Sequence, residues 1–168
     1  MTRMRTRDRD TEFKAFYDSE GARIRELAVF LVGDRELAAD LAQEAFLRAY
    51  GRWNRIRKGD PGPYVRRALV NLCKNAYRRR STEQRQWARP ATAQAVDPPN
   101  LEESLRIAEA LKVLSPMRRA AIVLRYYEDM SDEQIAVTLD RPLGTVKSDI
   151  RRGLQSLGPL LQEKARGR

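Results

Sequence analysis

The feature that most constrains this sequence is a helical spacing of apolar residues, which runs along nearly the whole chain and fades once, over 81–100. Apolar side chains recur every three or four positions on both sides of this stretch, whereas the stretch itself contains three prolines. Because proline breaks helices, we predict a linker there. A chain of 168 residues is long enough for two small domains. The expected fold is therefore all-α, with helical domains at 8–80 and 101–162 joined by a flexible linker.

The N-terminal block predicts three helices that share one core. We expect them at about 11–31, 34–53 and 63–80, with Gly33 ending the first. A basic loop, 55–62, precedes the third helix, and its DPGP sequence suits a helix start because proline fixes φ. The apolar positions at helical spacing, which should form the core, are Phe13, Phe16, Ile24, Leu27, Leu31, Leu37, Leu41, Ala45, Ala49, Trp53, Val65, Ala68, Leu69, Leu72 and Ala76.

The C-terminal block predicts a helix-turn-helix. Helices are expected at about 101–114, 116–127, 131–139 and 144–157, and the sequence SDEQ at 131 matches a capping box. A short capped helix, a turn of about four residues and a second helix describe a helix-turn-helix. The alternative is a pair of packed helices with a polar exterior. The residues of the last helix expected to point inward are Val146, Ile150 and Leu154.

The net charge of +10 is concentrated in one segment of the chain. Residues 8–54 carry seven basic and ten acidic side chains, whereas residues 55–89 carry eleven basic and two acidic ones. This density of positive charge is typical of a protein that binds the nucleic-acid backbone. The same segment also suits a solvated basic face or a surface that contacts anionic lipid.

The residue types exclude several classes of chemistry. The chain has no histidine, and its only cysteine, Cys73, falls among apolar helical positions and is expected in the core. Structural zinc, a Cys–His nucleophile pair and a serine triad are therefore excluded, and we expect no metal, no cofactor and no enzyme activity. No apolar run approaches the roughly 20 residues of a membrane span, so we expect a cytoplasmic protein without membrane insertion.

One face of the third predicted helix is polar and lies opposite the apolar face. Two amides between cations suggest base recognition, because a carboxamide can pair bidentately with a base edge. The preceding loop offers a polar rim that a flipped-out base could enter. The helix residues, which we name the Asn71 stripe, are Arg67, Asn71, Lys74, Asn75 and Arg78, and the loop residues are Arg57, Lys58, Gly59 and Asp60.

A helix-turn-helix lays its second helix in the major groove, with the side chains near its N-terminus at the base edges. In this sequence that helix begins near Gly144. Its outward residues that can hydrogen-bond bases or phosphates are Thr145, Lys147, Ser148, Arg151 and Arg152.

The second predicted helix has a polar face that contains one apolar residue. This face, which we name the Leu47 face, consists of Asp40, Gln43, Glu44 and Leu47. Partner binding would explain an apolar side chain among polar ones. An ordinary surface helix with a Glu44–Arg48 pair at i,i+4 explains the residues at least as well.

Three segments resemble the conserved regions of one family and follow the family's order. DRELAADLAQEAF, at 34–46, is similar to region 2.2 of the extracytoplasmic-function sigma factors of bacterial RNA polymerase, and YVRRALVNL, at 64–72, is similar to their region 2.4. LRYYEDMS, at 124–131, followed by GTVKS, at 144–148, resembles their region 4. The resemblance covers nearly everything except the ends and the linker, and it is closest to the actinobacterial SigE-type branch.

The resemblance implies a non-catalytic subunit, a monomer within the polymerase holoenzyme, that reads promoter DNA. The Leu47 face would dock on the coiled coil of the polymerase β′ subunit, and the β flap would be a further contact. The Asn71 stripe and the 56–60 loop would read and hold the melted −10 element. The outward residues of the last helix would read the −35 element, with Arg125 as a phosphate contact. The linker would run toward the RNA exit path, and an anti-sigma factor is an expected partner.

Several positions depart from the family's pattern. Asp140 and Arg141 stand where the family often has Gly and an apolar residue, Pro142 replaces a common Ser N-cap, and Asp149 stands where Arg is frequent. A carboxylate near phosphates must pair with a cation or accept from a base donor such as cytosine N4. The two arginines at 151–152 are near enough to pair with Asp149. We therefore expect an unusual or weakly bound −35 element.

Two other functions stay open from the sequence. A helix-turn-helix regulator with a sensing N-terminal bundle would need neither the Asn71 stripe nor the Leu47 face, and it would bind duplex operator without polymerase. A protein-interaction module that occupies polymerase or an anti-sigma factor as a decoy would bind polymerase without initiating transcription.

Overall fold

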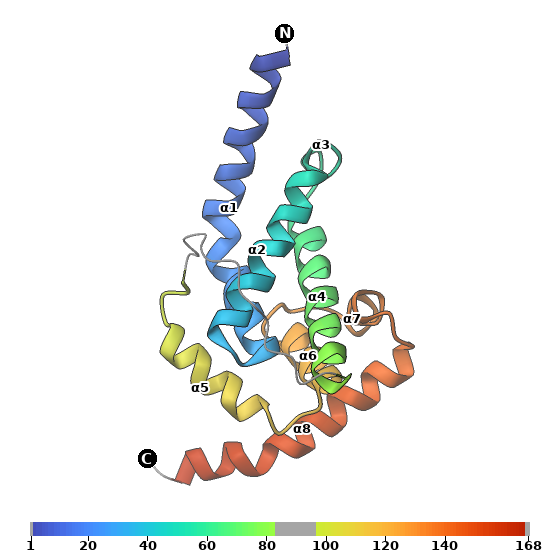
Figure 1. Ribbon diagram of the computed structural model, residues 1–168. Helices are drawn as coiled ribbons and strands as arrows, with labels where there is room; N and C mark the ends of the chain where they lie inside the picture. The colour runs from blue at the N-terminus through green and yellow to red at the C-terminus, as the bar shows by residue number, and fades with distance from the viewer. Residues whose placement is uncertain (1, 83–96, 167–168) are drawn as a thin grey trace.

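A computed structural model of the chain describes residues 2–82 and 97–166, with their side chains over 7–79 and 97–160. Every regular element in these ranges is a helix, so the all-α expectation is confirmed (Figure 1). The helices are α1 (Thr2–Val32), α2 (Arg35–Gly51), α3 (Trp53–Ile56), α4 (Gly62–Thr82), α5 (Leu101–Leu111), α6 (Pro116–Tyr126), α7 (Asp132–Leu139) and α8 (Leu143–Arg166). Most of the predicted linker, residues 83–96, lies outside the described residues.

α1, α2 and α4 pack around the predicted N-terminal core. Gly33 ends α1 with a φ of 66°, and Asp34 caps α2 by accepting a hydrogen bond from the Leu37 N–H at 2.8 Å. Cys73 is buried, as expected. The expected core positions that are fully buried are Ile24, Leu27, Leu31, Leu41, Ala45, Ala49, Trp53, Val65, Leu69 and Leu72, and the partly buried ones are Phe13, Phe16, Leu37, Ala68 and Ala76.

Two helix boundaries in this bundle differ from the expectation. α1 begins at Thr2 rather than near residue 11, and two residues of this additional segment, Arg9 and Asp10, contact Tyr50 of α2. The Arg9 guanidinium lies 4.2 Å from the centre of the Tyr50 ring, and the Tyr50 hydroxyl donates to Asp10 at 2.6 Å. The second difference is at Arg52, where a φ of −112° breaks the predicted 34–53 helix into α2 and α3.

The C-terminal half has the predicted helix-turn-helix. The capping box at Ser131 is present and starts α7. Asp140 ends α7 in the left-handed conformation, with a φ of 54°, which explains why glycine suits this position. The expectation that Leu154 points inward is wrong, because its side chain is 41% exposed. Gly153 takes the inward place, and α8 approaches α6 so closely there that a Cβ on Gly153 would lie 2.8 Å from Ile122 Cγ1.

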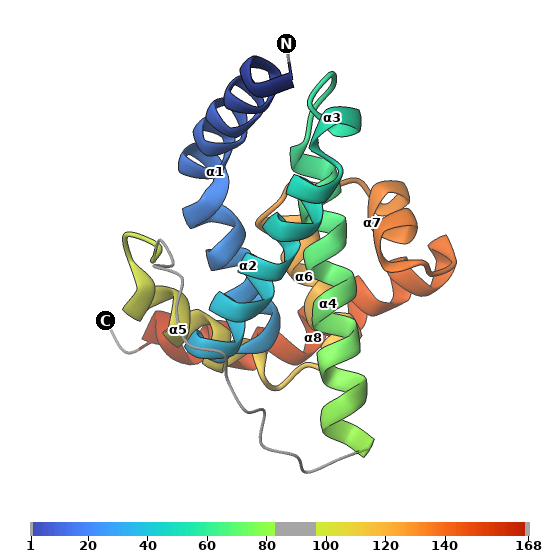
Figure 2. The same ribbon diagram turned by 45° about the horizontal axis from the view of Figure 1, so that its top comes forward.

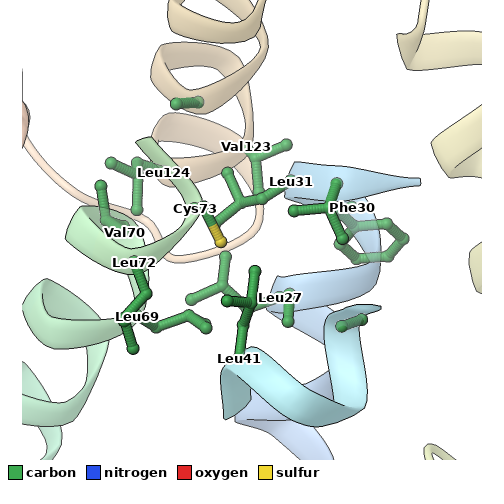
Figure 3. Packing of buried hydrophobic residues seen from close by; sticks show 14 of the residues in the cluster. Leu27, Phe30, Leu31, Leu41, Leu69, Val70, Leu72, Cys73, Val123 and Leu124 are labelled. Carbon is green, nitrogen blue, oxygen red and sulfur yellow. The ribbon is translucent and has the colours of Figure 1, made fainter. Parts of the chain in front are cut away.

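The N-terminal half of the molecule, α1 to α4, packs against the C-terminal half, α5 to α8. α5 and α6 contact α1, and α6 and α7 contact α4 (Figures 1 and 2). α4 therefore has a second buried side, formed by Val70 and Cys73, beside the apolar face that packs in the N-terminal core. In Figure 3 this side meets Val123 and Leu124 of α6 and Leu31 of α1.

Candidate nucleic-acid interface

The Asn71 stripe lies on the solvent side of α4, as predicted. Arg67, Asn71, Asn75 and Arg78 are exposed, while Val65, Leu69 and Leu72 on the opposite side are buried. Lys74 differs from the other members because it is half-buried, and its Nζ donates to the Leu139 carbonyl at the end of α7, at 2.8 Å. The stripe is therefore open at its N-terminal end and contacts the helix-turn-helix at Lys74.

The N-terminal end of the stripe forms one wall of a groove between α2 and α4. The groove has a volume of about 710 Å³. The Arg52 guanidinium lies 5.9 Å from the centre of the Tyr64 ring on the opposite wall. Sequence reasoning missed the α2 wall, because only the packing of α2 on α4 brings these residues to Asn71. The lining residues are Arg48, Gly51, Arg52, Tyr64, Arg67, Ala68 and Asn71.

Two of the loop residues predicted to hold a flipped base also make contacts within the protein. Arg57 forms an ion pair with Glu12 of α1, with 2.7 Å between Nη1 and Oε2. Asp60 shapes the start of α4, because its Oδ1 accepts a hydrogen bond from the Gly62 N–H at 2.9 Å. Lys58 is exposed and lies between them in the chain.

The predicted recognition helix is the N-terminal part of α8. Lys147, Arg151 and Arg152 are exposed, whereas Thr145 and Ser148 are half-buried. Arg125 lies at the end of α6 and donates to the Met130 carbonyl at 2.9 Å, so it also supports the turn between α6 and α7.

Asp149 is largely buried and points toward other residues of the protein. Its side chain is 12% exposed, and its Oδ2 accepts a hydrogen bond from Arg141 Nη1 at 2.6 Å. Its Oδ1 lies 3.5 Å from Arg118 Nε on α6. Asp149 is thus paired, but with Arg141 and Arg118 rather than with residues 151–152. Two departures from the family's pattern, Arg141 and Asp149, compensate each other in this ion pair.

The Leu47 face of α2 points away from the core. Asp40 and Glu44 are half-buried, Gln43 is exposed, and Leu47 is 57% exposed. Glu44 also forms the i,i+4 pair with Arg48, with 2.9 Å between Oε1 and Nε. The ion pair and the exposed apolar side chain therefore coexist, and neither of the two sequence interpretations excludes the other.

The described parts of the chain contain neither a membrane-spanning helix nor a cluster of metal-binding side chains. No helix there is both long and apolar enough to cross a membrane. No three Cys, Asp or Glu side chains of those parts come together in a way that could hold a metal ion.

Comparisons with known proteins match both halves of the chain. The model named Sigma-70 region 2 matches residues 16–83, and the model named Sigma-70, region 4 matches residues 104–157. The RNA polymerase sigma-E factor of Streptomyces avermitilis is 34% identical over 156 residues, which cover 91% of this chain and 87% of that protein. The ECF RNA polymerase sigma factor SigL of Mycobacterium tuberculosis is 33% identical over 159 residues, which cover 89% of each protein.

Two solved structures share the fold. One is the sigma factor RpoE in complex with the anti-sigma factor NepR from Bartonella quintana, with a TM-score of 0.65 and 22% identity over 89% of this chain and 96% of that chain. The other is CnrH in complex with the cytosolic domain of CnrY, with a TM-score of 0.62 and 22% identity over 90% of this chain and 88% of that chain.

The helix-turn-helix, together with the basic groove that contains the Asn71 carboxamide, is typical of a DNA-binding protein that acts in transcription. The chain belongs to the sigma-70 family of RNA polymerase sigma factors, in the extracytoplasmic-function group that includes the actinobacterial SigE proteins. It directs promoter-specific transcription initiation, and proteins of this family are generally non-catalytic partners of core RNA polymerase. Family membership removes the support for a regulator with a sensing bundle.

Proposed function

We propose that this sigma factor holds the −10 element as a single strand on the Asn71 stripe and reads the −35 element as a duplex with α8. The groove between α2 and α4 is the observation that carries the −10 assignment. Its arginines supply positive charge for phosphates, and Tyr64 supplies an aromatic ring on which an unstacked base can lie. Asn71 places a carboxamide at the same groove, where it can pair with a base edge.

The two asparagines of the stripe provide a matched experiment. Asn71 lines the groove, whereas Asn75 is exposed one turn further along α4 and does not line it. Run-off transcription with core polymerase on promoters with every single-base −10 variant measures base preference. We expect Asn71→Ala to lose discrimination at one −10 base, by about 1–3 kcal/mol for a bidentate contact, and Asn75→Ala to keep it. An unchanged −10 preference in Asn71→Ala would show that the groove does not read a base.

For the −35 element, we propose that Lys147, Arg151 and Arg152 contact DNA directly, because they are the exposed cations of the recognition helix. Thr145 and Ser148 add hydroxyl groups near its N-terminus. Arg125, at the end of α6, can add a phosphate contact. Its side chain is 43% exposed, although it also donates a hydrogen bond in the turn between α6 and α7.

For polymerase, we propose that the Leu47 face docks on the β′ coiled coil and that the C-terminal half contacts the β flap. Burial of Leu47 would remove the most conspicuous apolar side chain of α2 from water, and Asp40 and Glu44 would set the charge of the contact. In this arrangement the protein is a monomer in the holoenzyme, works in the cytoplasm and carries out no chemistry itself. A decoy that only occupies polymerase would fail the run-off transcription assay.

An anti-sigma factor is a further partner that we propose. An open cavity of about 860 Å³ lies between α4 and the helices α6 to α8. Its lining includes the apolar Val70 and Met117 and more cations, Lys74, Arg78, Arg118 and Arg141, than carboxylates, Asp140 and Asp149. An apolar lining with a surplus of positive charge fits a partner segment that has apolar side chains flanked by acidic ones. The solved relatives RpoE and CnrH are each in complex with another protein, NepR and CnrY respectively.

A further inference from the structure

One basic segment of the chain has no role in the function proposed above. Residues 2–9, about the first two turns of α1, contain four arginines and one aspartate. The segment precedes residues 16–83, which match Sigma-70 region 2. Arg3 and Arg7, like Arg5 and Arg9, are spaced four residues apart, and like charges at this spacing destabilise a helix. An anionic partner would offset this repulsion.

Contacts with α2 and with the loop before α4 hold the segment at one edge of the N-terminal half. Arg9 Nη2 donates to the Tyr50 carbonyl at 2.6 Å, and the Tyr50 hydroxyl donates to Asp10 at 2.6 Å. One turn further along α1, Glu12 forms an ion pair with Arg57 at 2.7 Å. The start of α1 therefore lies beside the loop that precedes the Asn71 stripe.

α3 lies at the same edge and is fixed to α1 by aromatic packing. The centre of the Trp53 ring lies 5.1 Å from that of Phe13 and 5.3 Å from that of Phe16. Figures 1 and 2 show α3 and the start of α1 at the same end of the molecule. Because Trp53 is buried against α1, the cations next to it in the chain are left in solvent, and both Arg52 and Arg55 are exposed.

The helical register divides the arginines of α1 between two sides of the helix. Successive residues of an α-helix are about 100° apart, so position 5 lies one turn before Arg9 on the side that faces α2 and the loop. Position 7 lies on the opposite side, where Arg7 is exposed. Arg5 and Arg7 therefore bring the same charge to different sides of one helix.

The cations on the α2 side of α1 continue the positive charge of the groove between α2 and α4. Arg52 belongs to both surfaces, because it lines the groove and directly precedes α3. Two carboxylates, Asp10 and Glu12, lie among six cations, so positive charge is in surplus. The cations, which we name the α1–α3 edge, are Arg5, Arg9, Arg52, Arg55, Arg57 and Lys58.

A polyanion is the partner that fits the α1–α3 edge. Residues 2–10 contain one large apolar side chain, Met4, whereas a helix that lies on a membrane surface needs an apolar face. In the proposed function, DNA already reaches the adjoining groove. Cations along a surface bind phosphates whatever the base sequence, and they position the DNA rather than read it.

We propose that the α1–α3 edge binds the phosphates of the promoter DNA that leaves the groove between α2 and α4 past α3. This contact lies beyond the −10 element and adds affinity without sequence preference. The inference rests on the proposed function, which assigns the groove to the −10 element.

Arg5→Gln and Arg7→Gln form a matched pair, because they remove the same charge from opposite sides of the same turns. The experiment measures the affinity of the holoenzyme for a labelled promoter fragment at several salt concentrations. We expect Arg5→Gln to weaken binding about five- to eightfold near 0.1 M salt and to reduce the slope of log affinity against log salt by about 0.7–0.9 unit. Arg55→Gln, on α3, should cause a similar loss. Arg7→Gln should leave both quantities unchanged, and all three variants should keep the helix content measured by circular dichroism.

Two shortened promoter fragments locate the contact in the DNA. Each fragment ends at a different edge of the −10 element. On one of them Arg5→Gln should bind as tightly as the wild-type chain, because the phosphates that Arg5 contacts are missing. A full deficit of Arg5→Gln on both fragments would contradict the proposed location.

Four outcomes would overturn the proposal. They are an unchanged salt slope in both Arg5→Gln and Arg55→Gln, equal losses in Arg5→Gln and Arg7→Gln, and weaker binding of Arg5→Gln to core polymerase or to phosphatidylglycerol vesicles at an unchanged promoter slope. Equal losses would reflect net charge alone, and the last two outcomes would assign the edge to a protein or to lipid. If Asn71→Ala kept its −10 preference, the proposed function would fail, whereas the difference between Arg5→Gln and Arg7→Gln would still decide whether the edge binds DNA.

Discussion

The most informative single substitution in the helix-turn-helix is Asp149→Asn. It keeps the size of the side chain but removes the charge that joins α8 to Arg141 in the turn and to Arg118 in α6. If Asp149 is a structural residue, as its burial indicates, the substitution should weaken the fold of this half. If it reads a base, the substitution should instead alter the preferred −35 sequence.

The structure sets the size of the expected effect. The 2.6 Å contact with Arg141 is a charge-assisted hydrogen bond, a class that contributes about 1.5–3 kcal/mol. Both arginine side chains are 34% exposed, so solvent screens part of the interaction. We therefore expect Asp149→Asn to lower the free energy of unfolding by about 2 kcal/mol, or Tm by about 4–8 °C for a chain of this size.

Urea unfolding followed by circular dichroism at 222 nm measures this loss. A double-mutant cycle with Arg141→Gln should return a coupling energy of about 1 kcal/mol or more, because the two side chains contact each other. Asp140→Asn is the matched control, since Asp140 is an exposed neighbour whose left-handed conformation asparagine also adopts. Unchanged stability of Asp149→Asn together with a shift at one −35 base would refute the structural role and place the carboxylate in the groove.

Three further predictions concern other surfaces. The double substitution Asp40→Arg and Glu44→Arg should abolish co-purification with core polymerase at unchanged helix content, and undiminished binding would remove the Leu47 face from the polymerase contact. Arg78→Ala should weaken DNA binding by the holoenzyme on all promoter sequences alike and reduce the slope of log affinity against log salt by about one unit, which titration at several salt concentrations measures. Above pH 10 the stability of the fold should fall, because burial, and then the hydrogen bond to Glu26, raise the pKa of Tyr127 in the folded chain. As the pH rises, Tyr127 ionises in the unfolded chain before it ionises in the folded chain. The contribution of neutral Tyr127 to the free energy of unfolding is therefore present below pH 10 and is lost above it. Urea unfolding from pH 9 to 11 should show a shallower loss in Tyr127→Phe, and an equal loss would assign the dependence to other groups, among them Cys73, whose raised pKa acts in the same direction.

The amino-acid sequence alone determined most of the helices and the sides on which they are buried or exposed; the exceptions are the start of α1, the break at Arg52 and the exposed Leu154. Local signals were sufficient for this, because a helix of period 3.6 separates apolar from polar side chains within one element. The Asn71 stripe and the exposed Leu47 follow from that spacing. The capping box at Ser131 depends on residues only three apart, and it too is present in the structure.

Tertiary structure decided which residues meet across elements. The α2 wall of the groove, with Arg48 and Arg52, exists only because α2 packs on α4. The partner of Asp149 is eight residues away in the turn, at Arg141, although cations stand closer to it in the sequence. The ion pairs of Glu128 could not be predicted from neighbouring residues, because its partners, Arg23 and Arg66, lie in the other half of the chain. The periodicity of a sequence indicates which face of a single helix is apolar. Which charged residues pair with each other depends on distances in the folded chain, and these distances cannot be read from the order of the residues.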